Sequence, residues 1–218
     1  MGIRYYDRRG RLKADTGGIR GPGPSPHYGV WFNLVPPKKS HFTLQSGGTL
    51  VQSAWGLVLT APASASTPNL RIVDRAVPTG DWVITAYLWP HLFAEGAFHH
   101  CGILLRESST GRLHSISFWD DSTLTISRWT SPTVFSANDM AATAMPGMVK
   151  HPLPLSIARQ NGAYVFRQWD GLGNQTLMSS ITLGDWLTAD RIGFYVNAGT
   201  ANIDAFMTVL SWEKQIVN

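Results

Sequence analysis

RIGFYVNAGTANIDAFMTVLSWEKQ, residues 191–215, is the stretch of sequence that decides the fold. On both sides of a central turn its apolar side chains recur at every second position: Ile192, Phe194 and Val196 first, then Ala205, Met207 and Val209. This period is typical of β-strands with one buried face, and a glycine in the turn tolerates positive φ, so the stretch predicts an antiparallel hairpin. Asn197, Asn202 and Asp204 gather at the turn, and we interpret them as turn anchors rather than as ligands.

Short apolar stretches separated by Pro, Gly, Ser and Asn clusters continue through the chain from residue 30 onward. The predicted strands cover residues 30–35, 41–45, 49–51, 55–60, 70–74, 81–89, 101–106, 112–119, 122–127, 153–159, 163–168, 176–179, 191–196 and 203–212. The best candidate for a short helix is GDWLTAD, residues 184–190. Charged residues make up only 15% of the chain, whereas it has 21 glycines and 13 prolines, a composition that favours short strands over long helices. The sequence therefore predicts an all-β sandwich or barrel of antiparallel sheets.

The first residues differ from the rest in composition, so we predict an extended basic N-terminal arm over 1–29 and a β-sandwich domain over 30–218. The run GGIRGPGPSP, residues 17–26, disfavours both helix and sheet. The arm carries the excess positive charge of the chain, which has a formal net charge of +4. Its expected assembly residues are Arg4, Tyr5, Tyr6, Arg8, Arg9, Arg11, Lys13 and Arg20. Because such a segment cannot bury its own surface, we expect it to contact another chain, in a homo-oligomer.

Four segments resemble a known family in their order and pattern. They are GDWVITAYLWP at 80–90, CGILLRESSTGRLHSISFW at 101–119, LPLSIARQNGAYVFRQWDG at 153–171 and DRIGFYVNAGTANIDAFMTVLSWE at 190–213. Over roughly residues 50–213 the chain resembles the concanavalin A-like lectin/glucanase superfamily in its laminin-G-like form. The resemblance implies an antiparallel jelly-roll β-sandwich and, in the lectin branch, carbohydrate binding.

The glucanase branch of that superfamily places its catalytic carboxylates alternately along one strand, and retaining hydrolysis needs them about 5 Å apart. The close acidic pair of this sequence, Asp120–Asp121, would point to opposite faces of a strand. No acidic residue has another one two or four positions away, and the motifs of serine hydrolases, zinc proteases and phosphate-binding loops do not occur. We therefore predict that the protein is not an enzyme.

Metal and thiol chemistry has few candidates in the sequence. Cys101 is the single cysteine, and its apolar neighbours predict a buried structural thiol. The adjacent His99–His100 pair would diverge on a strand, so we do not expect the two rings to share a metal. We predict no cofactor and no metal. The alternative that stays open is a calcium ion bound by Asp120, Asp121 and Asp139.

Sugar binding combines an aromatic face with side chains that form hydrogen bonds to hydroxyl groups. The segments SFWDDSTLTISRWTS, residues 117–131, and FRQWDGLGN, residues 166–174, hold both kinds of side chain. The candidate carbohydrate-binding residues are Trp119, Asp120, Asp121, Arg128, Trp129, Arg167, Trp169 and Asp170. The alternative is that these tryptophans, like most of the nine in the chain, fill the core.

These features favour a non-enzymatic structural protein of a virus particle, such as a bacteriophage tail, head-fibre or decoration component, assembled in the host cytoplasm. Residues 1–29 would bind other virion proteins, and the sandwich would bind a host surface glycan. The chain has neither the apolar run of a secretory signal nor one long enough to span a membrane, so we expect no export and no membrane partner. We do not expect nucleic acid as a partner, because Asp7 and Asp15 interrupt the cations of the arm. The alternatives are a free carbohydrate-binding module and a divergent glycoside hydrolase.

Overall fold

The computed structural model describes residues 4–6, 12–15, 35–63, 68–91, 98–121, 123–144, 152–169, 175–199 and 203–217. In the described part of the arm, β1 (Arg4–Tyr6) pairs antiparallel with β2 (Leu12–Asp15). Two short paired strands thus lie within the predicted arm. The rest of residues 1–29 lies outside the described residues, and the boundary between arm and domain stays a prediction.

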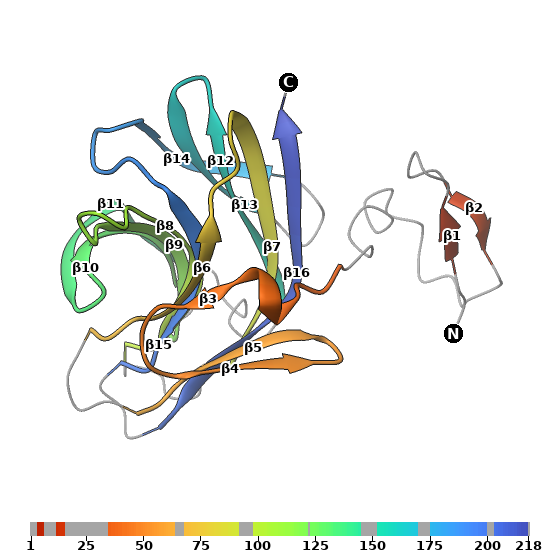
Figure 1. Ribbon diagram of the computed structural model, residues 1–218, viewed down its shortest axis with the longest axis horizontal. Coiled ribbons are helices and arrows are strands. Elements are labelled where there is room, and N and C mark those ends of the chain that lie inside the picture. The colour runs from red at the N-terminus through yellow and green to blue at the C-terminus, as the bar shows by residue number, and fades with distance from the viewer. Residues whose placement is uncertain are drawn as a thin grey trace.

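The described part of the domain forms two seven-stranded sheets, which Figure 1 shows facing each other. We name each sheet after its central strand. In the β8 sheet the strand order is β11-β10-β9-β8-β15-β6-β3. Its strands are β3 (Thr43–Leu44), β6 (Arg71–Ala76), β8 (His100–Arg106), β9 (Leu113–Trp119), β10 (Thr123–Ser131), β11 (Val134–Ala144) and β15 (Arg191–Asn197).

In the β7 sheet the strand order is β14-β13-β12-β7-β16-β5-β4. Its strands are β4 (Thr49–Ser53), β5 (Gly56–Ala61), β7 (Asp81–His91), β12 (Leu153–Gln160), β13 (Ala163–Trp169), β14 (Gln175–Thr182) and β16 (Ala205–Val217). A single turn of 3₁₀-helix, η1, covers Lys39–His41. All strand pairs are antiparallel, and the predicted all-β jelly-roll sandwich is confirmed. None of the helical structure in the described ranges is long and apolar enough to cross a membrane.

The stretch 191–215 does not form the predicted hairpin. β15 lies in the β8 sheet, paired with β6 and β8, whereas β16 lies in the β7 sheet between β5 and β7. Both strands still bury the alternate side chains that the sequence indicates, for example Phe194 and Met207, because the two strands face one core from opposite sheets. Apolar side chains at every second position show that a strand has one buried face, but they do not show which strand lies beside it. The two strands were therefore predicted correctly, and their pairing was predicted wrongly.

Polar residues at the end of β15 and just before β16 bind the backbone of other loops. Asn197 accepts a hydrogen bond from the backbone N–H of Asn69 at 3.0 Å, and Asp204 accepts one from Ala63 at 2.8 Å. Asn202 lies outside the described residues. The two described side chains therefore anchor neighbouring segments rather than the turn that they flank.

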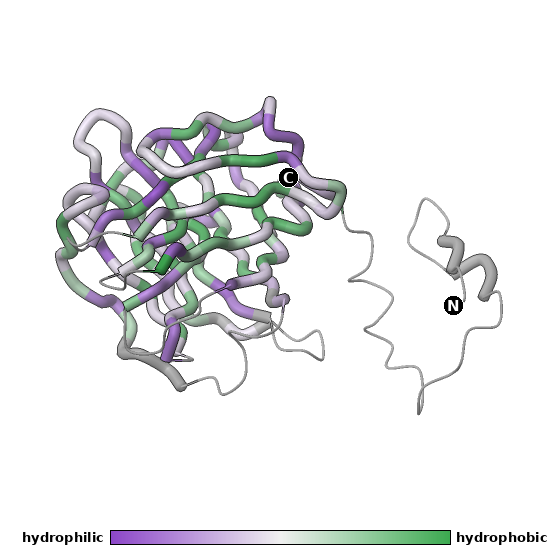
Figure 2. Tube along the Cα trace, turned by 90° about the horizontal axis from the view of Figure 1, so that it is seen from below, coloured by the Kyte–Doolittle hydropathy of each residue, from purple (hydrophilic) through white to green (hydrophobic). Residues whose placement is uncertain are grey.

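The main core fills the space between the sheets, and Figure 2 shows that apolar residues lie mostly along the strands. Its bulkiest fully buried side chains include Trp82, Phe118, Phe166 and Phe194. Cys101 belongs to this core, and burial raises the pKa of its thiol. The prediction of a buried structural thiol is confirmed.

A second, smaller core lies on the outer face of the β8 sheet. It consists of Leu70, Ile72, Leu104, Leu113, Trp129 and Tyr195. Leu104 illustrates the arrangement, because its neighbours Ile103 and Leu105 point into the main core while Leu104 points outward. In Figure 1 the strands β10 and β11 curl, and their register shifts at several points, as it does at β-bulges. The curl encloses a sheet face that would otherwise meet solvent.

Two glycines of the β8 sheet lie in close contact with the backbone of a neighbouring strand. A Cβ at Gly102 would be 2.0 Å from the carbonyl oxygen of Ile116, and one at Gly193 would be 2.0 Å from that of Val73. Because the obstacle is backbone in both cases, no side-chain movement could relieve it. Glycine is required at both positions by close approach.

Candidate functional site

Arg128 and Trp129, both predicted to bind sugar, are consecutive on β10 and therefore point to opposite faces of the strand. Trp129 is only 1% exposed and belongs to the second core. Its indole N–H donates to the hydroxyl of Ser115 at 3.1 Å, and its ring packs against Phe135 at 5.3 Å. Since no ligand can stack on an enclosed ring, the assignment of Trp129 as a binding residue is wrong and the core alternative holds.

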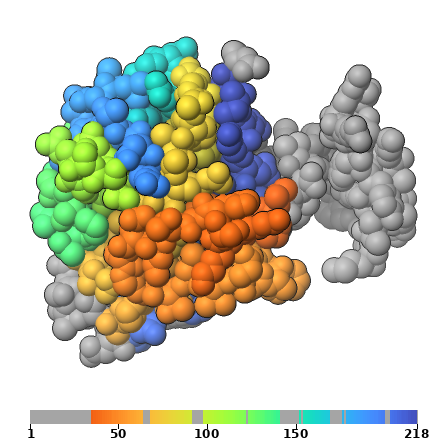
Figure 3. Space-filling model, viewed as in Figure 1, coloured from red at the N-terminus to blue at the C-terminus, as the bar shows by residue number. Residues whose placement is uncertain are grey.

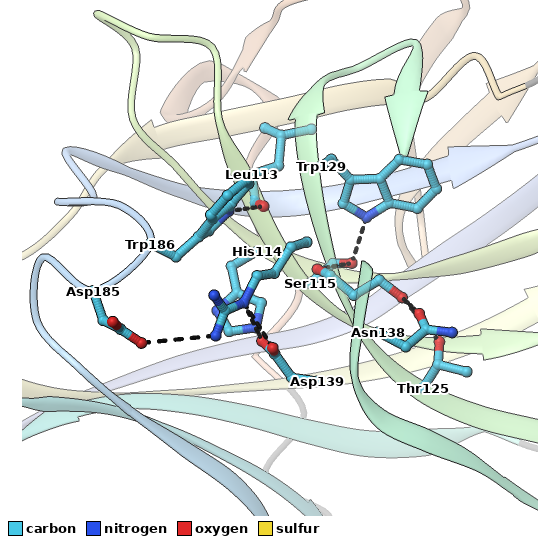
Figure 4. A network of polar contacts seen from close by, with 11 residues as sticks. Leu113, His114, Ser115, Thr125, Trp129, Asn138, Asp139, Asp185 and Trp186 are labelled. Atoms are coloured by element: carbon cyan, nitrogen blue, oxygen red, sulfur yellow. Dashed lines mark hydrogen bonds and ion pairs between the residues drawn. The ribbon is translucent and has the colours of Figure 1, made fainter. Parts of the chain in front are cut away.

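Arg128 forms ion pairs with Asp139 of β11 and with Asp185 of the loop that joins β14 to β15, and Figure 4 labels both acids. Its Nε lies 2.7 Å from the carboxylate of Asp139 on β11. The same carboxylate lies 2.7 Å from Nε2 of His114, which comes from β9. Nη2 of Arg128 lies 3.8 Å from the carboxylate of Asp185 in the loop. Three strands and one loop thus bring together charges that are far apart in sequence.

Trp186 completes this group, and its ring is fixed from two sides. The indole N–H donates to the carbonyl oxygen of Leu113 at 2.9 Å, and Nη1 of Arg112 donates to the carbonyl oxygen of Trp186 at 3.0 Å. The guanidinium carbons of Arg112 and Arg128 lie 5.0 and 5.5 Å from the ring centroid, within the range of cation–π attraction. We name this group the arginine–tryptophan cluster, consisting of Arg112, His114, Arg128, Asp139, Asp185 and Trp186.

Burial and charge set the protonation of the inner part of the arginine–tryptophan cluster. Burial raises the pKa of Asp139, but the hydrogen bonds from His114 and Arg128, together with the charge of Arg128, outweigh this effect and hold that pKa below its usual range. Burial lowers the pKa of His114, and the Asp139 carboxylate opposes only part of the change. His114 also packs against Phe166 of the opposite sheet at 4.4 Å. At neutral pH, therefore, Asp139 is ionised and His114 is neutral.

The outer part of the arginine–tryptophan cluster is accessible. The side chain of Asp185 is 60% exposed, and Trp186 is half-buried. An indole ring offers an apolar surface, while guanidinium groups donate and carboxylates accept hydrogen bonds. The cluster can therefore contact a ligand that combines C–H surfaces with hydroxyl groups.

Trp119 lies in a stack of rings on the outer face of the β8 sheet. His100 lies between Trp119, at 4.4 Å and 12° between the ring planes, and Trp129, at 5.5 Å and 15°. Nδ1 of His100 is 3.1 Å from the hydroxyl of Tyr195, and burial lowers the pKa of His100 to about 3. The indole N–H of Trp119 donates to the hydroxyl of Thr125 at 2.6 Å. Trp119 is half-buried, so it stays a candidate with one ring face covered by His100.

Asp120 and Asp121 hold the turn between β9 and β10. The carboxylate of Asp120 accepts from the backbone N–H of His99 at 3.0 Å, and the N–H of Asp120 donates to the carbonyl of His99 at 2.9 Å. The carboxylate of Asp121 accepts from the N–H of Thr123 at 3.1 Å and from its hydroxyl at 2.6 Å. The contacts of Asp121 stabilise the turn itself, whereas those of Asp120 tie the turn to the residue that precedes β8, so both acids have partners within the fold.

Of the other predicted sugar-binding residues, Arg167 and Trp169 lie on β13 of the opposite sheet. Arg167 lies on β13, where its Nη2 donates to the side-chain oxygen of Gln160 at 2.8 Å. The side chain of Trp169 and the whole of Asp170 lie outside the described residues. The predicted site therefore divides between two sheets.

Four of the eight predicted arm residues lie on the two strands of the arm. Arg4, Tyr5, Tyr6 and Lys13 lie on β1 and β2, but their side chains are outside the described part. The remaining four, Arg8, Arg9, Arg11 and Arg20, lie outside the described residues. Their role in assembly stays a prediction.

The open alternative of a calcium site has no geometric support among the described residues. No group of three His, Cys, Asp or Glu side chains in those ranges is placed to hold a metal ion. Asp139 is engaged by Arg128 and His114, whereas Asp120 and Asp121 are at the β9–β10 turn. The three carboxylates do not form one ligand set.

Four residues of the arginine–tryptophan cluster were not predicted from the sequence, and a fifth, Asp139, was considered only as a calcium ligand. The four are Arg112, His114, Asp185 and Trp186. The segment 184–190 was predicted as a short helix, but the structure forms turns and bends there. A signal was present, because Trp186 follows an acidic residue in a glycine-containing loop between two strands. What the sequence did not reveal is that this loop covers the ends of β9 and β10.

Sequence comparison with known proteins gives no match, either to a protein-family model or to a curated protein. Solved structures do match. The carbohydrate-binding module CBM66 from Bacillus subtilis aligns with a TM-score of 0.52 and 8% identity, over 84% of this chain and 97% of that one. The fold is that of the lectin-like jelly rolls.

Two further structures share this lectin-like jelly roll, and one is described as a lectin-like domain while the other is a GH43 protein. A legume lectin-like domain from Entamoeba histolytica has a TM-score of 0.54 and 13% identity, over 82% of this chain and 91% of that one. The GH43 protein BlXynB from Bacillus licheniformis has a TM-score of 0.57 and 11% identity, over 84% of this chain but only 40% of that one. Identities this low show the shared fold alone.

Proposed function

We propose that the sandwich binds carbohydrate and that the arginine–tryptophan cluster is its binding site. The observation that carries the proposal is Trp186, an indole ring fixed at the surface beside two guanidinium groups and the exposed carboxylate of Asp185. Sugars pack their C–H groups against such a ring while charged side chains bind their hydroxyl groups. The lectin-like fold supports the proposal, because two of the matched structures are described as a carbohydrate-binding module and a lectin-like domain.

We further propose that binding is not coupled to hydrolysis. A glycosidase needs a carboxyl group with a raised pKa as general acid. In the arginine–tryptophan cluster the pKa of Asp139 is instead held low by His114 and Arg128. Asp74, whose pKa burial raises, is enclosed by hydrogen bonds from Arg106 and Gln45. Neither carboxyl group combines a raised pKa with access to a substrate.

The setting that we propose is a virus particle, as a bacteriophage tail, head-fibre or decoration component. The arm over residues 1–29 would bind other virion proteins, and the sandwich would display its site to a host surface glycan. The distribution of positive charge supports the anchoring role of the arm. The excess cations of the chain all lie in residues 1–29, which leaves the domain close to neutral. The competing proposal is a free carbohydrate-binding module, in which the arm has no partner.

The test of the binding site is a glycan array followed by calorimetry on wild type and Trp186→Ala. We expect the variant to lose at least about 30-fold in affinity, because truncating a central tryptophan in a binding site typically costs about 2 kcal/mol. Trp55→Ala is the matched control, since Trp55 is 78% exposed at the β4–β5 turn of the other sheet. An equal loss of glycan affinity in both variants, or no loss in either, would show that the binding site does not lie at Trp186. A wild-type protein that binds no glycan would refute carbohydrate binding itself.

A further inference from the structure

Phe98, two residues before β8, has a backbone conformation that its side chain disfavours. Its φ is 59°, in the left-handed region. Within the described ranges Asn161 is the other residue besides glycine with a positive φ, and it precedes Gly162 at the turn between β12 and β13, where asparagine is common. A bulky residue in this region is strained, and the strain persists only where the surrounding structure imposes it.

Two polar side chains hold the backbone at Phe98. Nδ2 of Asn197 donates to the carbonyl oxygen of Phe98 at 3.2 Å, while its side-chain oxygen accepts from the N–H of Asn69 at 3.0 Å. The next residue, His99, forms two hydrogen bonds with Asp120, one to the carboxylate at 3.0 Å and one between backbone groups at 2.9 Å. These bonds fix the course of the chain through Phe98, and they impose its conformation.

Held in this way, Phe98 is 58% exposed, and its ring lies 6.4 Å from that of Trp119 at an angle of 85°. Trp119 is itself fixed, because it stacks on His100 at 4.4 Å and donates from its indole N–H to Thr125 at 2.6 Å. We name Phe98 and Trp119 the aromatic corner. A ring this exposed buries little apolar surface, so the core does not account for the strain at Phe98.

We propose that the aromatic corner is a second carbohydrate-binding site, which takes a neutral or amino sugar. Two rings at a right angle offer apolar walls to the C–H groups of a sugar, and rings that are already fixed lose little conformational entropy on binding. The turn that follows Trp119 carries Asp120 and Asp121. Their carboxylates disfavour an acidic sugar and attract the ammonium group of an amino sugar.

The aromatic corner is separate from the arginine–tryptophan cluster. Trp186 is bound to the carbonyl oxygen of Leu113, the first residue of β9, whereas Trp119 is the last residue of that strand. A strand of this length spans about 20 Å. Figure 3 shows the Trp186 end, where the turn between β8 and β9, in light green, lies at the surface beside the blue loop that joins β14 to β15. The proposal therefore goes beyond the proposed function.

An array of neutral and acidic oligosaccharides, read with full-length wild type, Phe98→Gly and Trp186→Ala, tests the second site. We expect neutral or amino-sugar glycans whose signal falls at least about tenfold in Phe98→Gly and persists in Trp186→Ala. Phe135→Gly is the matched control and should keep these signals, since Phe135 is 43% exposed and its ring packs against a different tryptophan, Trp129.

The array separates failure of the second site from failure of the proposed function. Signals that all depend on Trp186 and none on Phe98 would refute the second site and leave the proposed function standing. Glycans that depend on Phe98 but are all acidic would also overturn the proposal. A wild-type protein that binds no glycan would refute both sites.

Urea denaturation of the same variants tests whether Phe98 serves a ligand or the fold. The midpoint of Phe98→Gly should equal or exceed that of wild type, because glycine adopts a positive φ without strain and little buried contact is lost. The midpoint of Phe135→Gly should be lower, since glycine weakens a strand and the contact with Trp129 is lost. A midpoint of Phe98→Gly as low as that of Phe135→Gly would show that Phe98 stabilises the fold, and would overturn the proposal.

Discussion

His100 lies fully buried between two indole rings with Nδ1 on the hydroxyl of Tyr195. Burial lowers its pKa to about 3, whereas a histidine in an unfolded chain titrates near pH 6.5. Between these two values the unfolded chain binds a proton that the folded protein does not. The free energy of unfolding therefore rises with pH across this interval and falls on acidification.

We expect His100→Gln to weaken the acid sensitivity of the fold. From pH 7.5 to 5.0 the native His100 should lower the free energy of unfolding by about 2 kcal/mol, because each pKa unit corresponds to about 1.4 kcal/mol. Some dependence should remain, since burial also lowers the pKa of His91, His99 and His114. Urea denaturation at both pH values measures the difference. His41→Gln, at an exposed position of η1, serves as control, and equal pH dependence in wild type and His100→Gln would contradict the expectation.

At the scale of single elements, β11 depends on side chains more than its neighbours do. It forms one edge of the β8 sheet, and its register with β10 shifts at four points. Asp139 holds it to His114 and Arg128, and the side-chain oxygen of Asn138 accepts from the hydroxyl of Ser127 at 2.8 Å. These contacts compensate for a backbone ladder that bulges interrupt.

Asp139→Asn should loosen β11 before it affects the rest of the sandwich. The substitution keeps the shape but removes the charge that Arg128 pairs with, so we expect a loss of about 1–3 kcal/mol in the free energy of unfolding. Hydrogen exchange should become faster for Phe135–Met140 and stay unchanged in the β7 sheet. Ser136→Ala, an exposed change on the same strand, is the control. Uniform acceleration in both sheets would show that Asp139 stabilises the whole domain instead.

At the scale of the whole molecule, the two sheets share one core, which draws side chains from both of them. Within the described ranges, β1 and β2 pair with each other and with no strand of the two seven-stranded sheets. The domain should therefore not need residues 1–29 for its stability, which leaves the arm available for assembly.

Removing residues 1–29 separates the two proposed settings of the protein. We expect the shortened chain to be a monomer with an unchanged free energy of unfolding, while the full chain forms a defined oligomer or requires a partner to assemble. Light scattering and urea denaturation of both chains measure this. A shortened protein that still enters particles would contradict the anchoring role. Full-length and shortened chains that are both monomers would favour a free carbohydrate-binding module.

The sequence by itself determined the all-β class and most of the strands, because the burial of alternate side chains is a local property of a strand, but it did not predict β11. It identified Cys101 as buried, and it placed Arg128 among polar groups of the proposed site. Only the tertiary structure decided that β15 and β16 face each other across the core, that the curl of β10 and β11 encloses Trp129, and that Arg112 meets Trp186 across 74 positions of sequence. The physical reason is that periodicity records whether a side chain is buried, whereas the identity of its neighbours depends on sheet assignment, curvature and loop placement, which arise from contacts between distant segments.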